Sequence, residues 1–390
     1  MAQPLAGLRV ADFSHVMAGP YATHLLRLLG AEVIKIESPE RGDAMRYYGP
    51  DRAYDGMAPS FIAVNAGKKS ICLDLKDPAD FDIARRIVAR CDVLVENFRP
   101  GVMTRLGLGF DAVRELRPGI VYCAVSGYGQ SGALRDWPAI DNIVQATSGM
   151  MSLGGEPGDP PLRVGFPVVD TLTGQTAAFA ILSALLRQSR AGGEAEYIDV
   201  AMFDATLAFM ASAIVPFIVT GRALQRTGQV GFSGQPTSGV FRCQDGRHVS
   251  LGVVQQHQFE RFAALLGQEA WLHDPRFADP QARLRHADAL VAQLDTLLAQ
   301  HPAAHWERTL SAAGLPCGMI REVGEAVSLP HVAERGLRLP VHVPGLPGDA
   351  DVAVLNAGFR LGVDGPGTTA PPPRLDEHRD EILRWLESKD

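Results

Sequence analysis

Asp170 is the residue of this chain whose surroundings most suggest chemistry. It follows the apolar segment 163–169, which we expect to be a strand, and it precedes the Ala/Leu-rich segment 171–188, which we expect to be a helix. Several backbone N–H groups converge at a helix N-terminus and favour an ionised carboxylate there. An ionised carboxylate can attack an electrophilic carbonyl. The simpler interpretation is that Asp170 only caps the helix, and the local sequence by itself favours that role.

The composition predicts a large globular protein and argues against several functions. The chain has 390 residues, which is enough for two domains and a large core. Its 37 basic and 44 acidic residues give a net charge of −7, which disfavours nucleic-acid binding as the main task. The five cysteines are scattered, without a CxxC pair or a histidine at metal-ligand spacing. We therefore expect free thiols and no metal site.

Two segments bear on where the protein resides. Residues 1–7 lack the basic and apolar regions of a signal peptide. Residues 201–221 are apolar enough to suggest a membrane span, but Asp204 and Pro216 within them fit a buried or interface helix better. We expect a cytoplasmic protein that does not enter a membrane.

The elements that would position Asp170 follow a β-α-β pattern. Strands are expected at 8–13, 31–37, 70–75, 93–96 and 119–125, and helices at 21–29, 80–90, 171–188 and 198–215. Strands that alternate with helices predict an α/β fold with a parallel sheet wound on both faces. Residues 153–161 are expected to form a loop.

The chain changes character near residue 226. Two short strands, at 240–243 and 248–253, are followed by helical patterns from about 257 to 313. We interpret 226–325 as a smaller α+β domain. The rest divides into a large domain over 1–200, a linker helix over 201–225, and a C-terminal part, 326–390, that returns to the large domain and ends in a helix at 376–388.

Two signals for a dinucleotide site are weak. The first β-α-β unit ends in Glu37, where a ribose-binding acid would stand, but the turn before its helix lacks the three glycines that a pyrophosphate requires. A GxGxxG pattern occurs at 127–132, but the segment behind it is broken by Pro138 and is too short for the helix that must hold the phosphates. We expect no NAD.

A series of short motifs runs through the whole chain in one order. In the large domain the motifs are 8–10, 16–20, 29–37, 42–43 with Arg46, 65–70, 73–76, 96–101, 105–109, 126–130, and Asp170 with 173–174; in the small domain they are 274–277, Arg283 with His286, and 314–318. This series resembles the class III CoA-transferases, the family that includes formyl-CoA transferase and α-methylacyl-CoA racemase. The resemblance implies an enzyme that uses a coenzyme A thioester as co-substrate.

The resemblance also implies a fold and an assembly. The N-terminal part and the C-terminal tail would form a Rossmann-like large domain, with the smaller α+β domain inserted between them. Two subunits would thread through each other as an interlocked, ring-shaped homodimer. The segments 198–226 and 320–355 could supply the long linkers that threading needs, although a two-domain monomer could contain the same linkers.

The resemblance assigns Asp170 as a covalent nucleophile. Its carboxylate would attack the donor thioester to give a mixed anhydride, and the released CoA thiolate would return to form an aspartyl-CoA thioester. A fixed aspartate removes the entropy cost of bringing one of two anions to the site. By resemblance the CoA path is lined by Val16, Met17, Ala18, Leu73, Lys76, Asn97, Phe98 and Arg105. The CoA phosphates require cations, for which the candidates are Arg41, Arg46, Lys68, Lys69, Lys76, Arg99 and Arg105.

The loop 231–235 is expected to donate N–H groups to the thioester oxyanion and to act as a lid. The residues assigned to this substrate and oxyanion region are Gly231, Ser233, Gly234, Gln235 and Asp141. In the formyl-CoA enzymes the loop is a run of glycines, which Phe232 and Ser233 interrupt here.

Differences from the family pattern narrow the reaction. Ile140 stands where the racemase branch has its histidine, and 255–256 are glutamines where that branch has a glutamate. Neither side chain can serve as a base. By resemblance, Met17 replaces a glutamine of the formyl-CoA transferases, which argues against formate and oxalate as the preferred pair of acids. We expect transfer of CoA from an acyl-CoA such as succinyl-CoA to a small carboxylate; a 2-methylacyl-CoA racemase or isomerase, or a catalytically silent CoA-binding protein, is the alternative.

Overall fold

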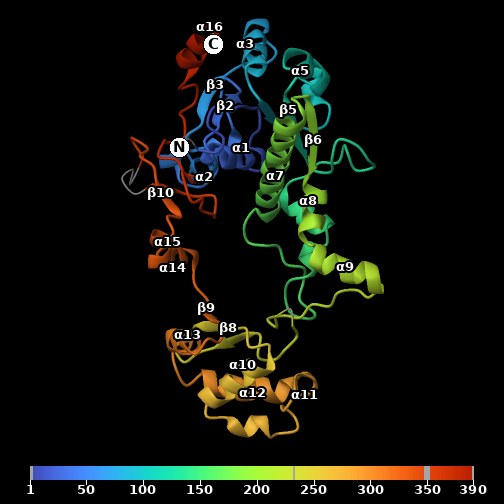
Figure 1. The fold of residues 1–390 in the computed structure, drawn as a ribbon, viewed down its shortest axis with the longest axis vertical. Helices are drawn as coiled ribbons and strands as arrows, with labels where there is room; N and C mark the ends of the chain where they lie inside the picture. The colour runs from blue at the N-terminus through green and yellow to red at the C-terminus, as the bar shows by residue number, and fades with distance from the viewer. Residues whose placement is uncertain (1–2, 232, 347–351, 389–390) are drawn as a thin grey trace. The chain divides into compact units, whose positions relative to one another are not determined.

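The computed structural model describes residues 3–231, 233–346 and 352–388. The chain clusters into two compact units, which are described separately (Figure 1). The larger unit contains Met1–Met150, Arg163–Arg222 and Pro330–Asp390, and the smaller contains Met151–Leu162 and Ala223–Leu329. The C-terminal segment therefore returns to the larger unit. The loop before residue 163, which was assigned to the large domain, groups with the smaller unit.

A six-stranded parallel sheet forms the centre of the larger unit, in the order β3-β2-β1-β4-β5-β6. The strands are β1 Arg9–Asp12, β2 Glu32–Glu37, β3 Lys69–Cys72, β4 Val93–Glu96, β5 Val121–Ser126 and β6 Glu196–Ala201. Strands β4 and β5 are buried along their whole length, as is usual where helices cover both faces of a parallel sheet. The prediction of an α/β fold with a parallel sheet is confirmed.

Helices cover both faces of this sheet (Figure 1). On one face α1 (Ala18–Leu28) and α7 (Val168–Ala191) pack against strand side chains in one apolar cluster. On the other face α3 (Pro78–Ala89), α5 (Phe110–Leu116) and α16 (Arg379–Glu387) form a second cluster. The strand order reverses between β1 and β4, so the loops that leave these two strands diverge at the carboxyl edge of the sheet. In α/β sheets, ligands generally bind in the crevice that forms at such a point.

The remaining elements of the larger unit are short. They are α2 (Pro59–Asn65), α4 (Val102–Arg105), α6 (Asp141–Thr147), α8 (Met202–Phe209), α9 (Ala211–Thr220), α15 (Pro330–Glu334), and the antiparallel pair β10 (Arg338–Pro340) and β11 (Ala353–Leu355), with 3-10 turns at Ala44–Tyr47, Arg52–Tyr54 and Met150–Ser152. Helices α8 and α9 are bent by 76° relative to each other. By length and composition, α7 is apolar enough to cross a membrane, and so is the α8–α9 pair if it is taken as one span. In the structure, however, α7 packs on α1 and β5.

Two predictions of secondary structure are wrong. No strand occurs at 163–169, because the chain runs irregularly to Pro167 and α7 begins at Val168. Proline has no N–H to donate to a sheet and is favoured at the start of a helix. The helix expected from residue 198 starts only at Met202, because the preceding residues form the edge strand β6 beside β5.

The smaller unit combines an antiparallel sheet with helices. Its strands, in the order β7-β8-β9, are Val240–Arg242, His248–Leu251 and Cys317–Met319. Its helices are α10 (Gln256–Leu265), α11 (Pro280–Arg285), α12 (Ala287–Leu298), α13 (Ala303–Ala312) and α14 (Val323–Val327), with a 3-10 turn at Glu269–Leu272. Phe259, Phe262 and Trp271 are among the buried aromatic residues of its own core. The third strand, β9, was not predicted.

Candidate active site

Asp170 lies in the first turn of α7 and is half-buried. The N-cap position is occupied by Pro167, so the interpretation of Asp170 as the cap is wrong. Asp141 performs that function instead: its Oδ2 accepts the N–H groups of Val169 at 2.7 Å and of Asp170 itself at 3.1 Å. Within the described part of the chain, the Asp170 carboxylate accepts no hydrogen bond.

Asp141 is held in place by the packing of α6 against α7. It is the first residue of α6, and its Oδ1 accepts a hydrogen bond from Nε2 of the fully buried Gln145 at 2.6 Å. The Oε1 of Gln145 in turn accepts the N–H of Val164 at 2.9 Å. Asp141 therefore belongs to the carboxylate pair around Asp170, and not to the loop 231–235 with which it was grouped.

The pair of carboxylates changes the acidity of Asp170. Burial first, and the negative charge of Asp141 second, raise the pKa of Asp170 from its ordinary 3.8 to about 7. The expectation that this environment favours the ionised form is wrong, because the N–H groups that would stabilise the ion bind Asp141. Near pH 7 a large share of Asp170 is ionised, and that carboxylate is more basic than an ordinary one and a better nucleophile.

Helices α1 and α7 cross closely just beyond Asp170. A Cβ added to Gly174 would lie 2.6 Å from the carbonyl oxygen of Ala18, so only glycine fits at this crossing. The crossing places the start of α1 beside the first turn of α7. Met17 and Tyr21 from the α1 side line a cavity of about 540 Å³ together with Phe166 and Thr171, the residue after Asp170.

The loops that leave β1 and β4 are joined at the crevice. The side-chain amide of Asn97 accepts the N–H of His15 at 2.9 Å and donates to the carbonyl of His15 at 2.8 Å. The rings of His15 and Phe98 lie with centroids 5.1 Å apart. The structure therefore brings the predicted CoA residues Asn97 and Phe98 next to the loop that carries Val16 and Met17 and leads into α1 at Ala18.

Three of the cations suggested for the CoA phosphates are used inside the protein. Arg46 forms a buried ion pair with Glu37 at 2.6 Å, and Lys68 forms one with Asp12 at 3.0 Å. Lys69 is paired with two glutamates, one on β2 and one on α16. The suggestion that Arg46 and Lys68 bind phosphate is wrong, since both are buried in pairs with carboxylates, whereas Lys69 is paired but partly exposed.

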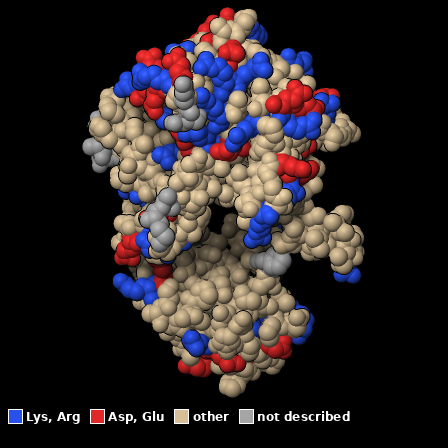
Figure 2. All heavy atoms as spheres, turned by 45° about the horizontal axis from the view of Figure 1, so that its top comes forward, with Lys and Arg blue, Asp and Glu red and all other residues tan. Residues whose placement is uncertain are grey.

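The other four cations remain free to meet an anion. Arg41, Lys76, Arg99 and Arg105 are exposed, and none forms an ion pair with the residues that the structure describes. Figure 2 shows Lys and Arg side chains gathered, among Asp and Glu, on the larger unit. Leu73, by contrast, is 2% exposed and belongs to the core, so its side chain does not line an open path.

The loop 231–235 lies in the smaller unit, and several of its N–H groups are already bonded. The N–H of Gly231 donates to the carbonyl of Ser238 at 2.6 Å, that of Gly234 donates to Gly231 at 2.9 Å, and that of Gln235 donates to Ser233 Oγ at 3.3 Å. Phe232 lies outside the described residues. As folded here, these three N–H groups are not available to an oxyanion, and the loop must rearrange before they can bind one.

The residues that stand in the places of racemase bases have structural roles. Ile140 is the N-cap residue of α6 and is 64% exposed. Gln255 caps α10 through a reciprocal pair of hydrogen bonds with Gln258. Gln256 accepts a hydrogen bond from Arg283 at 3.0 Å. The two glutamines therefore serve as amide hydrogen-bonding groups, and the Ile140 side chain is exposed.

Comparison with known proteins identifies the family. The family model for CoA-transferase family III matches residues 5–379. The chain belongs to CoA-transferase family III. Among its family III relatives, the acetyl-CoA:oxalate CoA-transferase of Acetobacter aceti is 39% identical over 377 residues, covering 96% of this chain and 93% of that one. The succinate–glutarate CoA-transferase of Agrobacterium fabrum is 34% identical, with 99% and 96% of the two chains covered.

A solved family structure has the same fold. A CAIB/BAIF family protein from Brucella suis superposes with a TM-score of 0.89 at 30% identity, covering 99% of this family III chain and 100% of that one. The two relatives named above are CoA-transferases, which use coenzyme A thioesters as co-substrates. Asp170, in the first turn of α7 beside the start of α1, therefore lies in a chain whose named relatives transfer CoA.

Proposed function

We propose that this protein is an acyl-CoA:carboxylate CoA-transferase that works through a covalent intermediate on Asp170. The observation that carries the proposal is the state of this carboxylate. It is half-buried, it accepts no hydrogen bond from the described residues, and burial, together with the charge of Asp141, raises its pKa to about 7. A basic, poorly solvated carboxylate beside a ligand crevice is suited to attack a thioester carbonyl.

Each step balances without an added reductant or oxidant. An oxygen of Asp170 attacks the carbonyl carbon of the donor thioester, the C–S bond breaks, and a mixed anhydride and CoA thiolate result. The thiolate attacks the carbonyl carbon of Asp170, which releases the donor acid and leaves an aspartyl-CoA thioester. The acceptor carboxylate then attacks this thioester, and the same two steps in reverse give the new acyl-CoA and free Asp170.

The resting geometry supports the first attack in two ways. Asp141 keeps the N–H groups of Val169 and Asp170 occupied, so they cannot bind the Asp170 carboxylate. Hydrogen bonds from them would stabilise the ionised Asp170 and make it a weaker nucleophile. The Gly174 contact fixes the first turn of α7 against α1, so the carboxylate is held by two crossing helices.

The cavity beside Thr171 bears on the acceptor acid. Its lining includes Met17, Tyr21, Leu25 and Phe166, which are mainly apolar surfaces. We propose an acceptor or donor acid with a short carbon chain, such as the succinyl group, in preference to oxalate. The acetyl-CoA:oxalate relative makes oxalate the necessary comparison in any assay.

The test is a panel assay with purified protein. Succinyl-CoA and acetyl-CoA are each incubated with oxalate, formate, succinate, glutarate and longer carboxylates, and new thioesters are followed by mass spectrometry. We expect at least one new acyl-CoA whose formation consumes the donor in equal amount. Hydrolysis of the donor without any transfer to an acid would contradict the proposal.

One observation favours a second candidate. Asp170 with a pKa of about 7 could remove an α-proton, which is the chemistry of an acyl-CoA racemase or isomerase. A racemase requires a second group to deliver a proton on the opposite face, and Ile140 has no titratable side chain. A transferase needs no second proton donor at this position, so the observed site fits transfer better than racemisation.

We further propose that the larger unit is Rossmann-like and that two chains form an interlocked, ring-shaped homodimer. The strand order 3-2-1-4-5-6 supports the first statement. Helix α9 supports association, since no residue of it is buried and Ile218 and Val219 are 70% and 76% exposed. Light scattering at micromolar concentration tests the dimer, and an active monomer would contradict it.

A further inference from the structure

The turn between β1 and α1 contains a backbone conformation that its residue disfavours. Val16 has φ of +66°, in the left-handed region where the side-chain carbon crowds the following carbonyl. A β-branched residue is rarely found there, and such conformations persist only where the surrounding structure imposes them. Glycine would adopt the same φ without strain.

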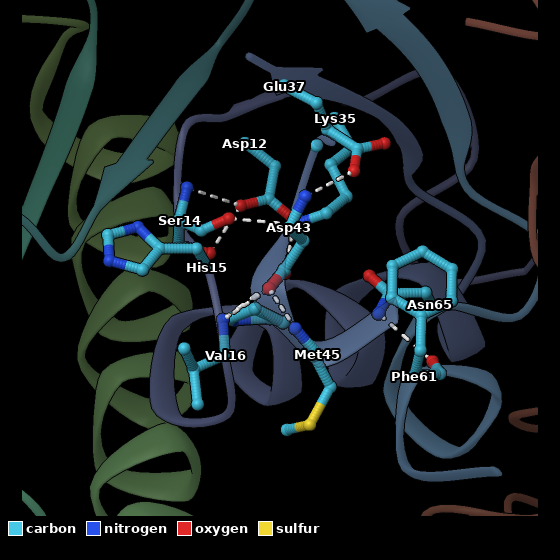
Figure 3. A network of polar contacts seen from close by, with 12 residues as sticks. Asp12, Ser14, His15, Val16, Lys35, Glu37, Asp43, Met45, Phe61 and Asn65 are labelled. Carbon is cyan, nitrogen blue, oxygen red and sulfur yellow. Dashed lines mark hydrogen bonds and ion pairs between the residues drawn. The ribbon is translucent and has the colours of Figure 1, made fainter. Parts of the chain in front are cut away.

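Asp43 binds the backbone of Val16 at this turn (Figure 3). Both carboxylate oxygens of Asp43 accept the N–H of Val16, at 3.0 and 3.2 Å, and Oδ1 also accepts the N–H of Met45 at 2.9 Å. Asp43 is 3% exposed, so these bonds are formed away from water. A hydrogen bond to a buried charged acceptor is stronger than a neutral one, which suits it to hold a strained residue.

A buried lysine fixes Asp43 in turn. Lys35 Nζ lies 3.0 Å from Asp43 Oδ2 and donates to the carbonyl of Ser14 at 2.7 Å, so it binds the turn directly before His15 and, through Asp43, at Val16. Asp12 and Glu37 are the other carboxylates near Lys35, and Lys68 neutralises Asp12. The turn is thereby tied to β1 and β2 by side chains that water does not reach.

The turn decides where α1 starts, and α1 contacts the helix of Asp170. Ala18, two residues after Val16, is the first residue of α1, and its carbonyl oxygen meets Gly174 one turn beyond Asp170. We propose that Asp43 is a positioning residue for the transfer reaction: by holding Val16 in the left-handed conformation, it fixes the N-terminus of α1 beside Asp170. The inference rests on the proposed function and names a residue that acts through the backbone.

The test is a double-mutant comparison at positions 16 and 43. Val16→Gly and Val16→Ala both remove the branched side chain, but only glycine removes the left-handed penalty, so alanine is the matched control. We expect Asp43→Ala to lower kcat at least tenfold in protein that is folded by circular dichroism. Val16→Gly/Asp43→Ala should recover to within threefold of Val16→Gly alone, whereas Val16→Ala/Asp43→Ala should stay at least tenfold below Val16→Ala alone.

The outcomes separate a positioning role from a structural one. If glycine rescues kcat no better than alanine, Asp43 does not act through the Val16 turn and the inference is overturned. If Asp43→Ala does not fold, Lys35→Met/Asp43→Ala takes its place, because it removes the buried ammonium with its partner. Thermal melting of Val16→Gly and Val16→Ala reads the strain without any activity assay: the glycine variant should melt higher, and an equal or lower Tm would also overturn the inference. If the wild-type protein has no transferase activity, the proposed function is contradicted, and the melting comparison still shows whether the Val16 turn is strained.

Discussion

Replacing Asp141 by asparagine should make Asp170 more acidic. The substitution removes the negative charge next to Asp170 but keeps an oxygen that can accept the N–H groups of Val169 and Asp170, as Asp141 Oδ2 does now at 2.7 and 3.1 Å. The pKa of Asp170 is raised, so its ionised form is the disfavoured one, and activity that needs a carboxylate must rise with pH through about 7. Without Asp141 the same rise should occur at lower pH.

The size of the change follows from the two causes of the raised pKa. The pKa of Asp170 stands about three above its ordinary 3.8, and burial contributes more than Asp141 does. Asp141 therefore accounts for less than half, which limits the change to roughly 1.5 pH units and keeps the new midpoint at or above about 5.5. At pH 5.5 about 3% of wild-type Asp170 is ionised against at most about half in the variant, a gain of up to roughly fifteenfold relative to each plateau.

The assay is kcat/KM for the acyl-CoA between pH 5 and 9, because this ratio reports the free enzyme. Asp111→Asn is the control, since Asp111 is an exposed residue of α5 on the opposite face of the sheet. The control should keep the wild-type midpoint. If the midpoint of Asp141→Asn stays within about 0.3 of wild type, or moves upward, Asp141 does not act on Asp170 as the structure indicates. The variant should also lose a few degrees of Tm, since the asparagine side chain offers no carboxylate to Gln145 and to the N-terminus of α7.

Three further predictions follow from the same geometry. Asp170→Asn should stabilise the folded protein above pH 7 by about 1–4 kcal/mol, because a carboxyl group with a raised pKa in the folded state lowers stability as pH rises from about 4 to 7. Denaturant titrations at pH 5 and 8 measure this gain, and an equal gain at both pH values would contradict the prediction. Gly174→Ala should cost about 1–3 kcal/mol in unfolding free energy and lower kcat, because the added Cβ would lie 2.6 Å from the Ala18 carbonyl oxygen. Unchanged Tm and kcat would show that α1 and α7 can separate to make room for it. The α-hydrogen of 2-methylacyl-CoA should not exchange with deuterated water at turnover typical of enzymes, ~10 per second, and rapid interconversion of both epimers would favour the racemase.

The parallel sheet was predictable because its strands are short apolar runs between helices. β4 and β5 were placed within two residues of their observed starts, since a strand buried on both faces has a continuous apolar pattern. β6 was missed because it lies at the sheet edge, alternates buried and exposed residues, and continues directly into the apolar helix α8. Its identity as a strand depends on pairing with β5, which is a contact distant in the sequence.

The site was predictable only in part. Asp170 was found from its place before an apolar helix and from the family motif. The partner Asp141 is 29 residues away, and only the packing of α6 on α7 makes it the cap and inverts the expected acidity of Asp170. Burial also explains the wrong assignment of Arg46 and Lys68, because a charge pattern does not show which cations are enclosed with carboxylates.

The most direct test of the central claim is to trap the enzyme during turnover and find the modified residue. Protein mixed with an acyl-CoA that it uses is treated with hydroxylamine or borohydride, digested and mapped by mass spectrometry. We predict a label on the peptide containing Asp170 and none in Asp170→Asn, as required for an anhydride or thioester on that carboxylate. A label on Cys72, Cys123 or Cys317, or continued turnover by Asp170→Asn, would contradict the account.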